Sequence, residues 1–133
     1  MLEVMHNGRL YVAETSAALR QMGVPDPAVD AAGADARMEA IKAECRRRIY
    51  AVASAESQMN MAAAVGVIAG KSAAERTAEE TATMAAAESA IGWVAAMRAA
   101  IVTLAEDANA DFTASAVWPD VPPDAVAMID ANF

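Results

Sequence analysis

The sequence predicts a mainly α-helical protein that begins with a small β-hairpin. Of its 133 residues, 56% are hydrophobic but only 5% are aromatic, because alanine is the commonest apolar residue. Alanine is the best helix former and offers little apolar area, so this composition favours long, thin helices. Apolar residues recur every three or four positions along two long stretches, which indicates helices with one apolar face. Near the N-terminus, by contrast, an Asn-Gly pair separates two short apolar runs.

The hairpin is predicted at residues 2–13. Asn7 and Gly8 lie between the apolar runs 2–6 and 9–13. Both residue types tolerate the positive φ angles of a tight two-residue turn, and an Asn-Gly pair in this setting is the strongest local sign of a β-hairpin.

A short helix is expected after the hairpin. Thr15 or Ser16 can cap its first turn, and Gly23 would end it. A proline-containing turn follows, so residues 1–25 are predicted to form a distinct region, a candidate for docking onto another protein.

The first long helix is predicted from Pro27 to Gly70, within a helical region that spans residues 26–110. Apolar residues recur every seven positions and others fill the intermediate positions, which gives one continuous stripe. Gly70 suits the C-terminal cap of this helix. The stripe residues that we expect to pack against other helices are Met38, Ile41, Cys45, Ile49, Val52 and Met59.

The second long helix is predicted to begin at Ser72. Ser72 and Glu75 have capping-box spacing, in which each side chain satisfies a free backbone N–H of the other. Most charged residues of this stretch lie off its apolar stripe. The stripe residues that we expect to pack against other helices are Met84, Ile91, Val94, Met97, Ile101 and Leu104.

Both helices are expected to be long. At 1.5 Å per residue, a helix of about 40 residues spans roughly 60 Å, more than the width of a compact domain of this size. We therefore expect an elongated αα-hairpin or coiled-coil-like pair. Because two alanine-rich helices bury little surface alone, copies of the chain are expected to form a homo-oligomer, such as a trimer. The alternative is a kink near Asn60 or Gly66, which would give shorter helices in a compact bundle.

Residues 111–133 form a tail of different character. Its prolines enforce extended or turn geometry, and Trp118 is expected to anchor the segment. A short helix is predicted from Pro123 to the C-terminus. The residues that we expect to dock onto a partner are Tyr11, Trp93, Trp118, Pro119, Pro122 and Phe133.

The composition argues against several classes of ligand. A net charge of −8 repels phosphate backbones, and the basic run Arg46–Arg48 is shorter than the usual nucleic-acid patch of about five to eight residues. A single cysteine excludes an internal disulfide, and one histidine with one cysteine cannot supply a zinc cage. We therefore expect no nucleic acid, metal or cofactor.

No membrane partner is expected either. The longest apolar stretch, Met61–Gly70, is about half of the ~20 residues that a spanning helix needs. The first ten residues lack the basic segment and the apolar run of a signal peptide.

The sequence contains no convincing catalytic group. The segment Gly66–Ser72 has three residues between its glycines, whereas a P-loop requires four. His6 has no base or nucleophile at a useful spacing, and Cys45 occupies a stripe position where a small core residue is expected. We expect the protein not to be an enzyme.

Three ordered features resemble small proteins encoded near bacteriophage tail genes. The first is the arginine-bearing helix Glu44–Ile49, followed by Gln58–Asn60. The second is the Trp93-x-x-x-Met97-Arg98 helix, and the third is the Trp118-Pro119-x-x-Pro122 segment. Together, over residues 43–123, they look like tail-fibre-associated and tail assembly chaperone-like proteins.

This resemblance implies a role in building or attaching a tail appendage, with neither a cofactor nor a reaction. The chain departs from the family in its length of alanine-rich helix, which suits a permanent component of the virion, made in the host cytoplasm. We therefore expect a structural protein of the tail, the tail tip or the tail-fibre attachment. The alternatives are a tail-fibre assembly chaperone that is absent from the mature virion, and a capsid decoration protein.

Overall fold

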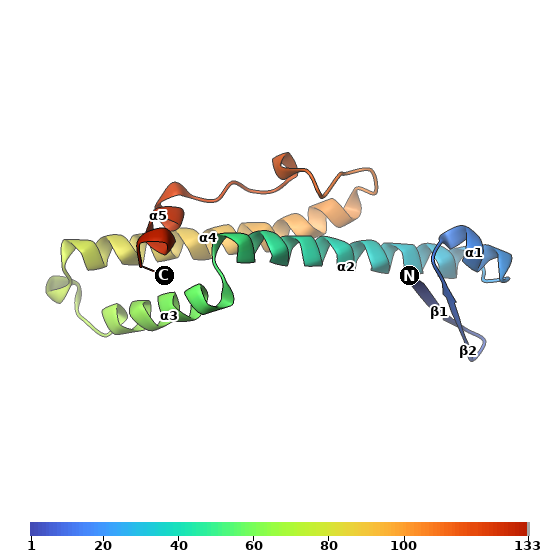
Figure 1. Ribbon diagram of the computed structural model, residues 1–133, viewed down its shortest axis with the longest axis horizontal. Coiled ribbons are helices and arrows are strands. Elements are labelled where there is room, and N and C mark those ends of the chain that lie inside the picture. Colours follow the sequence, from blue (N-terminus) through green and yellow to red (C-terminus); the bar gives the residue numbers. More distant parts are fainter. Residues whose placement is uncertain (133) are drawn as a thin grey trace.

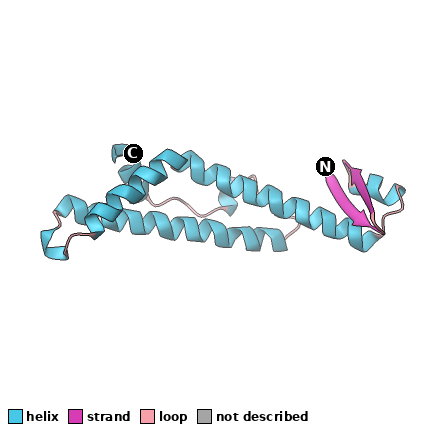
Figure 2. Ribbon diagram, turned by 90° about the horizontal axis from the view of Figure 1, so that it is seen from below, coloured by secondary structure: helices cyan, strands magenta, loops and turns pink. Residues whose placement is uncertain are grey.

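The computed structural model describes residues 1–132 and shows an elongated helical molecule (Figure 1; Figure 2). The predicted fold class is confirmed, since a two-stranded hairpin is followed by long helices and a short C-terminal helix. The elements are β1 (Leu2–His6), β2 (Arg9–Ala13), α1 (Ser16–Gln21), α2 (Asp26–Val52), α3 (Ala55–Ala69), α4 (Ala78–Glu106) and α5 (Pro123–Asn132), with 3₁₀ turns at Ala73–Glu75 and Ser115–Val117.

The N-terminal hairpin and α1 form as predicted. Asn7 and Gly8 have φ angles of 49° and 74°, as the tight turn requires, and the Thr15 hydroxyl caps α1 by accepting from Ala18 N–H at 3.1 Å. These elements do not stand alone, because Leu19 and neighbouring apolar residues share a small core with Val29 of α2. The N-terminal region therefore sits on the first turns of α2, at one end of the molecule (Figure 1).

The predicted continuous helix from Pro27 to Gly70 is wrong, because the chain breaks between α2 and α3. Ala53 has extended backbone, and the Ser54 side chain accepts from Ser57 N–H to start α3. Gln58 donates to the Ala53 carbonyl at 2.9 Å, which satisfies a backbone acceptor that the break releases.

The predicted alternative of a kink near Asn60 or Gly66 is also wrong in position, since both residues lie within α3.

The start of the second long helix is displaced too. Ser72 N–H donates to Glu75 at 3.1 Å, so the predicted capping interaction exists, but it stabilises only a 3₁₀ turn. A second capping box, Thr77 with Glu80, begins α4.

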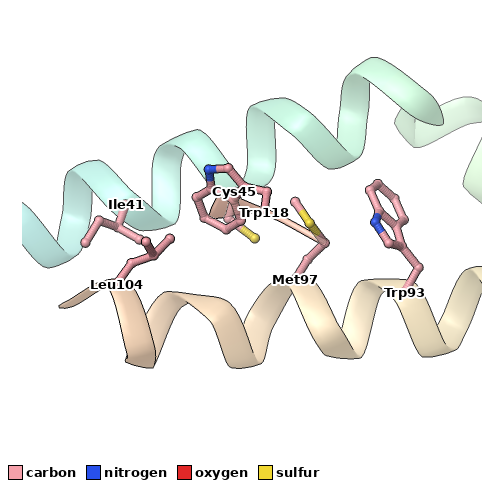
Figure 3. Packing of buried hydrophobic residues seen from close by; sticks show 6 residues of the cluster. All are labelled: Ile41, Cys45, Trp93, Met97, Leu104 and Trp118. Carbon is pink, nitrogen blue, oxygen red and sulfur yellow. The ribbon is translucent and has the colours of Figure 1, made fainter. Parts of the chain in front are cut away.

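The main core lies between α2 and α4, which run antiparallel. Figure 3 shows Ile41 and Cys45 of α2 facing Leu104 and Met97 of α4. Most alanines add little to this interface, so a few larger side chains supply the buried area. The buried members of this cluster are Ile41, Cys45, Trp93, Met97, Leu104 and Trp118.

Residues 107–122, which we call the strap, return along α2 and α4 and lead into α5 (Figure 1). Arg37 holds its beginning by donating to the carbonyls of Leu104, Asp107 and Ala110. This guanidinium helps to cap α4, because Leu104 lies in the last turn of the helix, where carbonyls have no partner within the helix. The same group lies over the Phe112 ring, 5.2 Å from its centroid.

The middle of the strap is held by Arg48. Its guanidinium donates to the Thr113 carbonyl at 2.8 Å and lies 5.7 Å from the centre of the Trp118 ring. Glu44 orients this arginine through a 2.8 Å ion pair. Hydrogen bonding by Arg47, together with the positive charges of Arg47 and Arg48, holds the pKa of Glu44 at about 2.

Glu44→Gln tests this ion-pair network through its pH dependence. Because the native pKa of Glu44 lies below its ordinary value of 4.5, the carboxylate stabilises the fold above that pH and loses its effect as the pH falls toward 2. Urea unfolding at a series of pH values should show the variant less stable by about 1 kcal/mol at pH 7, with the difference shrinking below pH 4.5. Glu39→Gln, which breaks an exposed pair with Lys42, should change little; a pH-independent cost at Glu44 would contradict the assignment.

Ile41→Ala should destabilise the α2–α4 core by about 2–4 kcal/mol, because it leaves a cavity at a fully buried position. Met59→Ala, at a position of the same predicted stripe that is 72% exposed, should stay within about 0.5 kcal/mol of the parent. Chemical denaturation measures both, and equal losses would show that the packing in Figure 3 is not the core.

Candidate protein-docking groove

An apolar groove with a volume of about 550 Å³ opens where α3 diverges from α4. Figure 2 shows α2 and α3 meeting at an angle above α4, so the break at Ala53 sets the width of the groove. The strap and α5 contribute the remaining wall. The larger apolar side chains that line it are Ile49, Val52, Met61, Val65, Ile91, Trp93, Val94, Val121 and Ile129.

Small residues on both helices leave the groove unfilled. Ala62 and Gly66 of α3 and Ala87 and Ala90 of α4 line it, and their small or missing side chains leave the space open. Gly66 in particular has open space where a Cβ would lie. The alanine-rich composition therefore produces an uncovered apolar channel, where longer side chains would have given a filled core.

One end of the groove is basic. A second hollow of about 340 Å³ shares Ile49, Gln58, Val94 and Arg98 with the groove, and Arg46 adds another guanidinium. Both arginines are exposed, and within residues 1–132 neither is hydrogen-bonded or ion-paired to the protein. Two uncompensated cations at one site are notable in a chain of net charge −8.

Cys45 lies at the base of this hollow and is 3% exposed. Burial raises the pKa of its thiol, against a smaller opposing effect from the charges of Arg98 and Arg46. The thiol is therefore protonated at neutral pH, when it is a poor nucleophile. This agrees with the predicted role of Cys45 as a small core residue.

Residues 1–132 contain no cluster of three His, Cys, Asp or Glu side chains that could hold a metal ion, and the buried residues among them are all hydrophobic. What the groove provides is apolar surface with charge at one end, which suits packing against another polypeptide.

The structure brings most of the predicted stripe residues together. Ile49, Val52, Val94 and Ile101 pack around the main core, and Met38 and Met84 are half-buried. Met59 and Ile91, by contrast, are 72% and 67% exposed and belong to none of the three hydrophobic clusters of residues 1–132, although Ile91 lines the groove. As contacts in an oligomer, they stay predictions.

The residues expected to dock onto a partner are mostly used inside the chain. The Trp93 indole donates to the Pro119 carbonyl at 3.1 Å, and the Trp118 indole donates to the Phe112 carbonyl at 2.7 Å. The indoles are 8% and 5% exposed, so they anchor the strap and leave little surface for a partner. The sequence correctly identified Trp118 as an anchor.

The other expected docking residues are less central. Pro119 and Pro122 are half-buried in the strap, and Tyr11 is half-buried on the hairpin with Arg9 over its ring. Phe133 lies outside the described residues.

Sequence reasoning missed the arginines that hold the strap and the groove wall on α3. Arg37 carries no local signal, because its acceptors lie some seventy positions along the chain. Arg48 was interpreted only as part of a basic run. The Ala53-Ser54 break had one available signal, since Ser54 followed by Glu56 and Ser57 can start a helix.

Helix α4 is apolar and poorly covered. Among the described residues it is the one helix long and apolar enough to cross a membrane, and 28% of its most apolar window is buried. Length and composition alone are weak evidence for a membrane-spanning helix, because the core helices of soluble proteins share them. The low burial does show that residues 1–132 leave much of α4 uncovered.

No known protein family matches this chain, and no curated protein is recognisably related to it.

The burial of Cys45 predicts slow reaction with thiol reagents. A maleimide at neutral pH should modify Cys45 about 100-fold more slowly in the native protein than in urea, because modification requires local opening. Ala63→Cys supplies an exposed thiol on α3 as an internal reference, which should react at the unfolded-state rate. If Cys45 reacts as fast as that reference, the hollow is not closed at its base.

Proposed function

We propose that this protein is a structural component of a bacteriophage particle, at the tail, the tail tip or the tail-fibre attachment, and that it acts by packing against other protein chains. The observation that carries the proposal is the open apolar groove in an elongated chain. Uncovered apolar surface of this kind is stabilised when a partner excludes water from it.

The shape of the groove supports packing against a helix or an extended segment. Its floor is made by alanines and a few larger apolar side chains, so a partner backbone can approach closely and gain contact along its length. The basic end formed by Arg46 and Arg98 favours a partner that carries carboxylates at that point.

The setting in a phage particle is supported by the resemblance and by how the residues that carry it are arranged. Trp93 and Pro119, which belong to two separate motifs, are joined by the indole hydrogen bond. Arg48, from the first motif, lies over Trp118 of the third. The three motifs thus form one structural unit, which explains why they occur together in one sequence.

A tail-fibre assembly chaperone is the second candidate. It is favoured by the fact that the groove is already formed in a single chain, as a transient binder requires. The two candidates differ in where the protein is found after assembly.

Mass spectrometry of purified phage particles separates the candidates. Particles made by the host that carries this gene should contain the chain after extensive purification, at a copy number typical of tail components. A chain abundant in the infected lysate but absent from the particles would overturn the structural role and support the chaperone.

Ala62→Trp tests the groove itself. The indole would fill the groove from an exposed position on α3, so the fold should keep its thermal stability while incorporation into particles falls by about tenfold or more. Ala63→Trp, on the same helix and also exposed but outside the groove, is the matched control and should be incorporated normally. Equal incorporation of both variants would show that the groove is not a contact surface.

A further inference from the structure

The outer face of α4 carries a stripe with the spacing of a helix–helix seam. Its residues alternate at intervals of four and three, the pattern that keeps side chains on one line of a helix that pairs with another. We call this line the outer stripe; its members are Met84, Glu88, Ile91, Ala95, Arg98 and Val102.

The outer stripe has no partner within the described chain. Ile91, at the middle of α4, and Val102, in its last two turns, are 67% and 56% exposed, so residues 1–132 leave most of each branched side chain uncovered. Glu88 and Arg98 are exposed as well, and within residues 1–132 neither forms an ion pair. Because Ile91, Ala95 and Arg98 also line the groove, the stripe and the groove form one continuous surface.

The outer stripe is complementary in charge and apolar character to a second copy of itself that runs in the opposite direction. Glu88 and Arg98 lie at equal distances on either side of residue 93, as do Ile91 and Ala95, and Met84 and Val102. A second α4 running antiparallel about a two-fold axis at residue 93 therefore sets each Glu88 against an Arg98, twice. The same arrangement sets Ile91 against Ala95 and Met84 against Val102, and it places no like charges against each other.

Gly92 gives an independent indication at the same place. It lies in the middle of α4, where glycine costs helix stability relative to alanine. Nothing in the chain requires it, since a Cβ at this position would meet no atom within 4 Å. Gly92 follows Ile91 by one position, so it flanks the outer stripe at the level of the two-fold centre, where a missing side chain leaves room for the second helix.

We propose that the partner on this face is a second copy of the chain, and that two copies pair through their α4 helices in an antiparallel, two-fold arrangement. This inference rests on the proposed packing function and names one partner for it. A closed two-fold contact gives an even number of copies, so it favours a dimer over the trimer suggested by the sequence.

The charges decide between this arrangement and two others. A parallel pair would place Glu88 against Glu88 and Arg98 against Arg98, which is repulsive. A bilayer covering the stripe would bury both charges in hydrocarbon without a counterion. Only the antiparallel pair uses the two charges to add to the contact.

A charge-exchange series tests the pairing. Sedimentation of the full chain should show a dimer whose dissociation constant rises by about tenfold or more in Glu88→Arg and in Arg98→Glu, because each change makes two attractive contacts repulsive. The double variant restores opposite charges and should return to within about threefold of the parent. Glu3→Arg, the same charge change on the outer face of the hairpin, should leave dimerisation unchanged, and circular dichroism checks that each variant is folded.

Two results would overturn the pairing. One is a monomer at every concentration, including a monomer that floats with phosphatidylglycerol vesicles, which would assign α4 to a membrane. The other is a dimer that both single variants leave intact, or that the double variant fails to rescue.

A distance measurement fixes the direction of the pair. Spin labels at Val102→Cys in a Cys45→Ala background lie nine positions from the centre in each copy, so an antiparallel pair separates them by about 27 Å along the helices. A parallel pair would place them side by side and would contradict the proposal.

A chain found in phage particles but monomeric in solution would remove this inference and leave the proposed function standing, whereas a dimer absent from particles would do the reverse.

Discussion

The hydrogen bonds and ring contacts that hold the strap are what the rest of the structure depends on. An alanine-rich pair of helices buries little area. In this chain the shortfall is met by the indoles of Trp93, in the middle of α4, and Trp118, in the strap, and by the guanidinium groups of two arginines on α2. Trp93 and Trp118 each combine buried ring area with a hydrogen bond to a strap carbonyl. Arg37 and Arg48 supply donors for the irregular backbone. These four side chains direct residues 107–122 back along the helices, and Phe112 and Val121 add apolar contacts with the core.

The strap in turn produces the groove. By returning over the core it delivers α5 to the far side of α4, where Met128 and Ile129 pack with Ala53, Ala86 and Ala87. That small cluster holds the break between α2 and α3 in place, because the extended residue at the break, Ala53, is buried within it. The break turns α3 away from α4, and the small side chains on both helices leave the space between them open. An uncovered apolar surface thus follows from a core that is thin.

The sequence predicted those features that rest on local signals. Asn7-Gly8, the Thr15 cap and the stripe at Ile41, Cys45 and Met97 were recognisable because turn chemistry and helical periodicity act over a few residues. The break at Ala53 was missed because periodicity continues across it, and the cluster that stabilises it joins residues far apart in the chain. The same limit applies to Arg37, whose acceptors are distant carbonyls. Trp93 and Trp118 were expected to dock onto a partner, and Trp118 also to anchor the tail, whereas here the indole N–H groups of both donate to carbonyls of the strap.

The central claim is that the uncovered apolar surface around the groove and the outer stripe of α4 is covered by protein in the working assembly. Hydroxyl-radical footprinting measures this side chain by side chain, by comparing the dilute isolated chain with the chain in purified particles. The account predicts that Met61 and Ile91, which line the groove, are oxidised less in the particle than in the isolated chain. Met5 of β1, a strand at the other end of the molecule (Figure 1), is 67% exposed and serves as the reference, because neither surface includes it. Equal oxidation of Met61 and Ile91 in the two states would contradict it.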